Sequence, residues 1–161
     1  MKPILFNTEM VRAINEERKT VTRRVVKPQP KGRLIPELPN SCWPGYFGEE
    51  GTPRVVRPPY FVGDILYVRE TWQEVYETEV DDYAQEGFVN IRERIHNFDD
   101  IPKVEAGIST DSSFAAMKPR MKYWVFKASD IKYTDPKNEI CWRPSIHMPK
   151  EAARIWLKVT D

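Results

Sequence analysis

The feature that most constrains this fold is a cluster of prolines in the first half of the chain. Eight of the fourteen prolines lie between residues 27 and 60. Proline removes a backbone donor and clashes inside a helix, so this segment cannot contain a long helix or a central strand. Because aromatic side chains are scattered among the prolines, we expect an extended insertion packed on the domain surface, or a flap over an active site. The eight are Pro28, Pro30, Pro36, Pro39, Pro44, Pro53, Pro58 and Pro59.

Regular structure is therefore expected on either side of this segment, and its pattern is mainly β. Asn7 or Thr8 would cap a helix over residues 9–16, and Pro149 would start a short helix over 150–153. Residues 73–120 are acidic and then irregular, with a loop expected at 107–113. We expect an α+β, mainly β fold in a single domain of residues 1–161, with irregular insertions at about 27–60 and 73–120. Alternating apolar residues predict strands at 3–6, 21–26, 65–72, 122–128 and 154–160.

The charges are unevenly distributed, although the net charge is only +1. A basic stretch over residues 18–33 contains no acid, and an acidic stretch over 74–86 contains no lysine or arginine. The densest basic part is the helix–strand junction, residues 17–24, which also carries two threonine hydroxyls. So many donors suit an anionic ligand, although the alternative is that the two stretches neutralise each other. The candidate binding cations of the junction are Arg18, Lys19, Arg23 and Arg24.

Two further segments carry polar side chains in unusual settings. In the strand predicted at 65–72, Glu70 shares a face with Leu66 and Val68, so the carboxylate would need a partner unless the strand end is exposed. Residues 142–149 contain two prolines around Ser, Ile, His and Met, which predicts a stiff loop with chemically useful side chains. The candidate binding residues from these segments are Arg69, Trp72, Trp142, Ser145 and His147.

Cysteine and histidine do not indicate a metal site. Cys42, Cys141, His96 and His147 show no ligand spacing, so we interpret the cysteines as structural thiols and expect no metal or other cofactor. The sequence has no signal peptide and no apolar run of about eighteen residues. We therefore expect a cytoplasmic protein with reduced thiols and no membrane contact.

A short motif and three longer blocks resemble the ASCH domain family, in particular its larger branch associated with phages and prophages. The family pattern Gly-x-Lys-x-x-Thr-x-Arg matches at Lys19, Thr22 and Arg24. The resemblance implies a small β-barrel of the PUA-like type with an N-terminal helix, and the host cytoplasm as the location of a phage-encoded member. The blocks are Lys-Pro-Ile-Leu-Phe from Lys2, Gly-Asp-Ile-Leu-Tyr-Val-Arg-Glu-Thr-Trp from Gly63, and Pro-Ser-Ile-His-Met-Pro-Lys from Pro144.

The chain departs from the family pattern in two places. Glu17 occupies the position of the family's glycine, a residue free to take a positive φ, so we expect the helix end to differ and Lys19 to shift. The family's last helix and closing strand have no counterpart after residue 160. We therefore expect a barrel that is open, completed by the insertion, or completed at an unpaired edge by self-association or a partner protein.

The first functional hypothesis is a binding module, because the PUA-like fold is associated with RNA recognition. The junction cations would neutralise phosphates, and Trp72 or Trp142 would stack on bases. The alternative for both tryptophans is core packing. The expected partner is a nucleic acid, RNA in the first place, or a nucleotide-like ligand such as a modified nucleoside.

The second hypothesis is an enzyme, because some small ASCH proteins are amidohydrolases that deacetylate N4-acetylcytidine. By the resemblance, Thr22 is the nucleophile and Lys19 the base that accepts its proton. The family's catalytic glutamate has no match in this chain. Glu70 is the carboxylate that we consider as a substitute, on chemical grounds alone.

Overall fold

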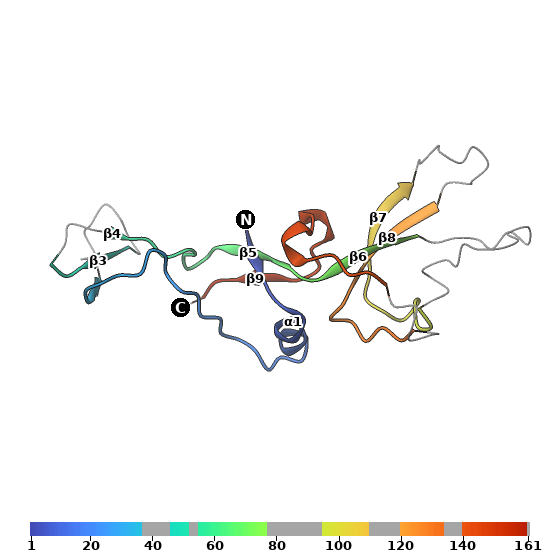
Figure 1. Cartoon of the computed structure of the whole chain (residues 1–161), viewed down its shortest axis with the longest axis horizontal. Coiled ribbons are helices and arrows are strands. Elements are labelled where there is room, and N and C mark those ends of the chain that lie inside the picture. The colour runs from blue at the N-terminus through green and yellow to red at the C-terminus, as the bar shows by residue number, and fades with distance from the viewer. Residues whose placement is uncertain (37–45, 52–54, 77–94, 110–119, 134–139, 161) are drawn as a thin grey trace, which may run out of the picture.

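The computed structural model describes residues 1–36, 46–51, 55–76, 95–109, 120–133 and 140–160. This part is α+β and mainly β, with one helix and three sheets of three strands each (Figure 1). The expected fold class is confirmed, but the described strands form separate sheets and close no barrel. The elements are β1 (Lys2–Leu5), α1 (Thr8–Asn15), β2 (Leu34–Pro36), β3 (Phe47–Glu49), β4 (Val55–Val56), β5 (Ile65–Arg69), β6 (Trp72–Tyr76), β7 (Val104–Ser109), β8 (Arg120–Phe126), the 3-10 turns η2 (Ser145–His147) and η3 (Lys150–Ala152), and β9 (Trp156–Lys158).

The central sheet has the order β1-β5-β9, with β1 parallel and β9 antiparallel to β5. Its inner face contributes Ile4, Leu66 and Val68 to a core that also contains Val11 of α1. The strand predicted over residues 65–72 is wrong at its end, because β5 stops at Arg69 and the chain enters another sheet at β6. The break falls at Glu70, whose buried carboxylate binds a distant arginine.

Helix α1 forms where the sequence predicts it and for the predicted reason. The Asn7 side chain caps the helix by accepting the Met10 N–H at 2.8 Å, which satisfies one of the free donors of the first turn. Glu9 provides negative charge at the positive end of the helix dipole. The cap therefore fixes where the chain leaves β1, and the helix covers the inner face of the central sheet.

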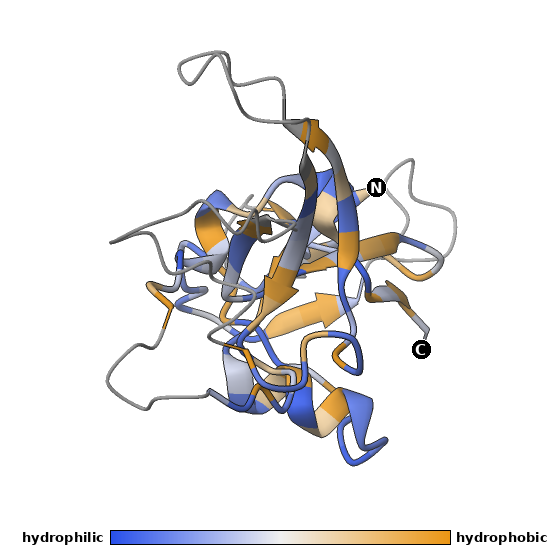
Figure 2. Ribbon diagram, turned by 90° about the vertical axis from the view of Figure 1, so that its right-hand side faces the viewer, coloured by the Kyte–Doolittle hydropathy of each residue, from blue (hydrophilic) through white to orange (hydrophobic). Residues whose placement is uncertain are grey.

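The β8 sheet has the order β6-β8-β7 and separates two apolar clusters. Val125 and Phe126 point to opposite faces of β8, and both are fully buried because β8 is the middle strand. The loop predicted at 107–113 is wrong for residues 107–109, which belong to β7; residues 110–113 lie outside the described part. Gly107, at a φ of 92°, lies at the register shift of β7, where a bulge favours glycine. In Figure 2 the strands carry most of the hydrophobic segments.

The proline-rich insertion contains a small sheet of its own, with the order β2-β3-β4. The expectation that this segment contains no central strand is wrong, because β3 is the middle strand of this sheet. The three strands are only two or three residues long, and Pro36 is tolerated at the end of the edge strand β2. The buried carboxylate of Glu49 accepts the backbone N–H groups of Lys31 and Gly32, and this holds the preceding loop against β3. In Figure 1, β3 and β4 lie at one end of the molecule, β5 and β9 in the middle, and the β8 sheet at the other end.

Asp64, in the turn before β5, makes stability depend on pH. A hydrogen bond from Lys2 Nζ at 2.6 Å and one from the Phe61 N–H at 2.9 Å hold the pKa of Asp64 below its ordinary 3.8. The unfolded chain therefore binds a proton at higher pH than the folded one, so this stabilisation is complete above about pH 5 and is lost as pH falls through the lowered pKa. We expect Asp64→Asn to lower the melting temperature at pH 7, with a difference from wild type that vanishes at low pH. A constant difference across an acid melting series would contradict this, and Asp130→Asn is the control at an exposed aspartate.

Candidate functional site

The end of α1 turns the chain back over the helix and so positions the Lys/Thr/Arg motif. Glu17 takes a left-handed conformation with a φ of 58°, and the Lys19 N–H donates to the Ala13 carbonyl at 2.9 Å. A glycine is thus not required for this conformation here. The helix ends through a left-handed residue at the position where the family pattern has glycine, at a cost of about 1–2 kcal/mol for a side chain there.

Glu17→Gly should therefore stabilise the protein. Glycine adopts a positive φ without steric cost, and its greater freedom in the unfolded chain offsets only part of that gain. We expect the free energy of unfolding to rise by about 0.5–1 kcal/mol, measured by urea denaturation. The matched control is Glu16→Gly, at a φ of −89°, which should bring no gain. Equal effects of the two changes would contradict the argument.

The strand predicted at residues 21–26 is wrong, because this segment pairs with no described strand. Val21 and Val25 are 65% and 69% exposed. The Arg24 guanidinium donates to the Leu5 carbonyl at 2.5 Å and lies over the Phe6 ring at 5.5 Å. Side chains also occupy this edge of β1 elsewhere, since the Tyr60 hydroxyl donates to the carbonyl of Pro3. The segment is therefore held beside β1 by a side chain and not by a backbone ladder.

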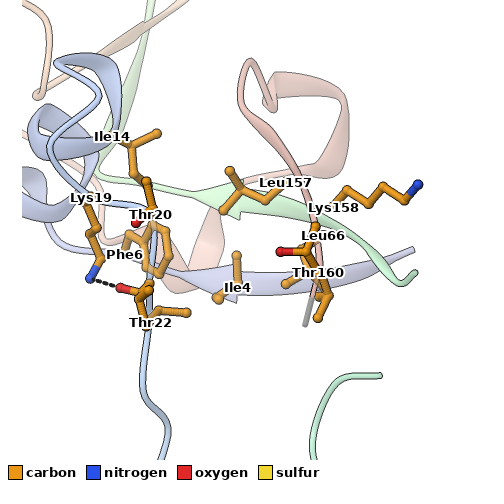
Figure 3. Close-up of a pocket in the computed structure, with 12 residues that line it drawn as sticks. Ile4, Phe6, Ile14, Lys19, Thr20, Thr22, Leu66, Leu157, Lys158 and Thr160 are labelled. Atoms are coloured by element: carbon orange, nitrogen blue, oxygen red, sulfur yellow. Dashed lines mark hydrogen bonds between the residues drawn. The ribbon is translucent and has the colours of Figure 1, made fainter. Parts of the chain in front are cut away.

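Between this segment and β9 lies a pocket of about 230 Å³ (Figure 3). Its lining includes Lys19 and Thr22 of the motif, which the sequence predicts as site residues. The apolar part of the lining comes from α1 and the core side of the central sheet, and the opposite rim from the end of the chain. No carboxylate is among the lining residues within the described part of the chain. These are Ile4, Phe6, Ile14, Lys19, Thr20, Val21, Thr22, Leu66, Leu157, Lys158, Val159 and Thr160.

Lys19 and Thr22 share this pocket without bonding to each other. The Lys19 ammonium donates to the Val21 carbonyl at 2.7 Å, as the dashed line in Figure 3 shows. An ammonium has three donors, so two are left for a ligand. Both side chains are half-buried. The arrangement can therefore offer a partly desolvated cation and a hydroxyl to a small polar ligand.

The other junction cations differ in their contacts and in their availability to a ligand. Arg18 forms an ion pair with Glu16 at 2.5 Å, with both side chains more than half exposed. Arg24 is engaged with Leu5 and Phe6, whereas Arg23 is exposed and forms no ion pair within the described residues. Of the four cations, Lys19 lines the pocket and the three arginines lie outside its lining.

Glu70 lies away from this pocket and is part of a buried ion pair. It is 1% exposed, and its two oxygens accept Arg154 Nε and an Arg154 terminal nitrogen at 2.9 Å each. The Arg154 guanidinium also lies 4.4 Å from the centroid of the Phe126 ring. The exposed strand end considered for Glu70 is wrong, and the partner that a buried carboxylate requires is Arg154. Nothing in the sequence pairs two residues that are 84 positions apart.

The remaining predicted site residues lie either in the apolar clusters of the β8 sheet or where the outer face of β5 meets η2. Trp72 is 5% exposed and packs in the core beside Phe126, and Trp142 is half-buried against the other cluster of the β8 sheet. Arg69 lies on the outer face of β5, where it donates to the Ile146 carbonyl of η2 at 3.1 Å. The other two candidates, half-buried Ser145 and exposed His147, are the ends of η2. The structure brings none of these side chains to the lining of the pocket.

General features and comparisons add no further constraint on function. Within the described ranges, no helix is long and apolar enough to cross a membrane. The same residues contain no cluster of three His, Cys, Asp or Glu side chains that could hold a metal ion. No family model, curated protein or solved structure matches this chain. The geometry of the pocket and of the surrounding sheet is therefore the basis of the functional argument.

Proposed function

We propose that the pocket binds a nucleotide-like ligand, either a free nucleoside or nucleotide or one unit of an RNA, in a PUA-like domain whose sheet stays open. The observation that carries this proposal is the composition of the pocket. Apolar side chains such as Phe6, Leu66 and Leu157 suit the flat face of a base, while Lys19 and Thr22 supply polar groups at its edge. Small-molecule sites in proteins are in general mostly apolar, with a few polar groups that orient the ligand.

The size and charge of the pocket support a small ligand. Sites for drug-sized molecules occupy roughly 300–1,000 Å³, so about 230 Å³ suits a single nucleoside unit. The described lining residues include Lys19 and Lys158 and no carboxylate, and Figure 3 shows the Lys158 side chain running away from Lys19. Arg23, exposed in the same segment, would meet the phosphates of neighbouring units.

Calorimetric titration with cytidine 5′-monophosphate tests the proposal. We expect Lys19→Ala to raise Kd roughly 10- to 150-fold, because a hydrogen bond to a charged group is lost, and Thr22→Val to raise it roughly 2- to 10-fold. Lys132→Ala, at an exposed lysine that does not line the pocket, is the control and should bind as wild type does. Equal affinities of the Lys19 and Lys132 variants would contradict the proposed site.

A second function, deacetylation of an N4-acetylcytidine-type nucleoside, is supported by the fact that Lys19 and Thr22 line one pocket. With Lys19 in its neutral form, the Thr22 oxygen would attack the acetyl carbon while Lys19 accepts the hydroxyl proton; the C–N4 bond would then break as that proton passes to the departing cytidine N4, and water would release acetate from Thr22. Among the described lining residues there is no carboxylate, and Glu70 is not one of them but is bound to Arg154, which favours binding as the first proposal. Release of cytidine from N4-acetylcytidine by wild type, lost in Thr22→Ala, would reverse that order.

A further inference from the structure

The outer face of the central sheet has a composition unlike that of the pocket side. Strand register places Pro3, Tyr67 and Trp156 in one row across β1, β5 and β9. Arg69 follows beside Tyr67 on β5, and Lys158 follows beside Trp156 on β9. Because side chains alternate along a strand, these residues lie on the face opposite to the buried core. We call this surface the Trp156 face; the residues that register assigns to it are Pro3, Leu5, Ile65, Tyr67, Arg69, Trp156 and Lys158.

Trp156 is displayed on this face by its neighbours. Trp156 is 45% exposed, more than any other Trp, Tyr or Phe whose side chain the structure describes. The Tyr67 ring supports it, with 5.9 Å between ring centroids and an interplanar angle of 47°. The Arg69 guanidinium also lies over the Tyr67 ring, 5.8 Å from its centroid. Tyr67 is only 8% exposed, so it fixes Trp156 and Arg69 in place.

The charges of the Trp156 face favour an anionic partner. Arg69 and Lys158 contribute two cations, and no acidic residue is among those that register assigns to it. Figure 3 shows the Lys158 side chain running outward, away from Lys19 and Thr22. A second copy docked on the same face would bring like charges together, and a purely apolar partner would leave them unpaired. A single-stranded nucleic acid matches both the aromatic ring and the cations of this face, because bases stack on aromatic rings and phosphates pair with cations.

We propose that the Trp156 face is a stacking platform for single-stranded nucleic acid, with a base on the Trp156 indole and phosphates at Arg69 and Lys158. The Trp156 indole lies on the sheet face opposite the pocket-lining Leu66 and Leu157, and Lys158 borders the pocket but extends its side chain away from Lys19. An occupied pocket would take one nucleotide unit, whereas the platform takes successive bases of a strand with little sequence preference, because every base has a π-face.

Fluorescence anisotropy with a labelled single-stranded RNA of about eight nucleotides, within the site size of a single stacking module, tests this directly. We expect Trp156→Leu to raise Kd roughly 5- to 150-fold, and Trp156→Phe to keep most of the affinity because a ring is retained. Ile108→Ala, at a 59% exposed apolar residue of the β8 sheet, is the control and should not change Kd. Lys158→Ala should reduce the slope of log K against log salt by about 0.7, the value for one phosphate contact to a single strand.

Three results would overturn the platform. One is wild-type affinity in Trp156→Leu, and another is no binding of the RNA by wild type at low salt. The third is concentration-dependent dimerisation in sedimentation that Trp156→Leu abolishes while RNA affinity is unchanged, because the face would then be an interface between copies. Failure of the pocket is distinguishable, since it is measured with mononucleotides and the Lys19 variant.

Discussion

Replacing Glu70 by Gln should lower the free energy of unfolding by about 3–5 kcal/mol, the cost of removing one partner from a buried ion pair. Glu70 is 1% exposed and Arg154 12%, so the guanidinium left behind has little access to water. Natural domains are stable by roughly 5–15 kcal/mol. The loss is therefore a large part of the total, and we expect a much lower denaturation midpoint for Glu70→Gln in guanidinium chloride, followed by circular dichroism.

The double variant Glu70→Leu/Arg154→Met separates the charge from the packing. Replacing both partners of a buried pair by apolar residues of similar size is often neutral or stabilising, so the double variant should recover most of the loss. A stable, folded Glu70→Gln that has lost ligand binding or turnover would contradict this account, and would give Glu70 a chemical role. The double variant is needed because a loss of activity in Glu70→Gln alone would also result from unfolding.

Phe6→Ala should have a similarly large effect, about 3–5 kcal/mol for a fully buried phenylalanine. Phe6 is 3% exposed and belongs to the core beneath α1. It also lines the pocket and supports the Arg24 guanidinium, so its loss removes the surface on which the junction is held. Urea denaturation should show the loss of stability, and Phe6→Leu should cost less because less volume is removed.

Val25→Ala is the matched control for Phe6. Val25 lies in the same junction but is 69% exposed, and such a surface change should stay within about 0.5 kcal/mol of wild type. A Phe6→Ala variant as stable as Val25→Ala would mean that the junction is not held on the core in this way.

Local interactions are the part of this fold that the sequence predicts well. The α1 helix depends on Asn7 and Glu9, which lie within its first turn, and their chemistry indicates the start of the helix without knowledge of the fold. The strand at 122–128 is confirmed as β8, shifted by two residues at each end, because its apolar run identifies a strand buried on both faces.

Contacts between distant residues are the part that sequence patterns miss. The break between β5 and β6 depends on Glu70 meeting Arg154, which no local pattern contains. The absence of a strand at 21–26 depends on Arg24 occupying the Leu5 carbonyl at the edge of β1. The Lys/Thr/Arg motif predicts Lys19 and Thr22 as site residues. By contrast, the contribution of β9 to the pocket and the exposure of Trp156 follow only from strand register.

The central claim is that a nucleotide-like ligand occupies the pocket between the motif and β9. The most direct measurement is a titration of the ¹⁵N-labelled protein with cytidine 5′-monophosphate, followed by amide chemical shifts. The account predicts saturable shifts at Lys19, Thr22 and Leu66 and at residues 157–160, with much smaller ones in Lys19→Ala. Shifts that centre on the β8 sheet or the insertion sheet, or no saturable shift at millimolar ligand, would contradict it.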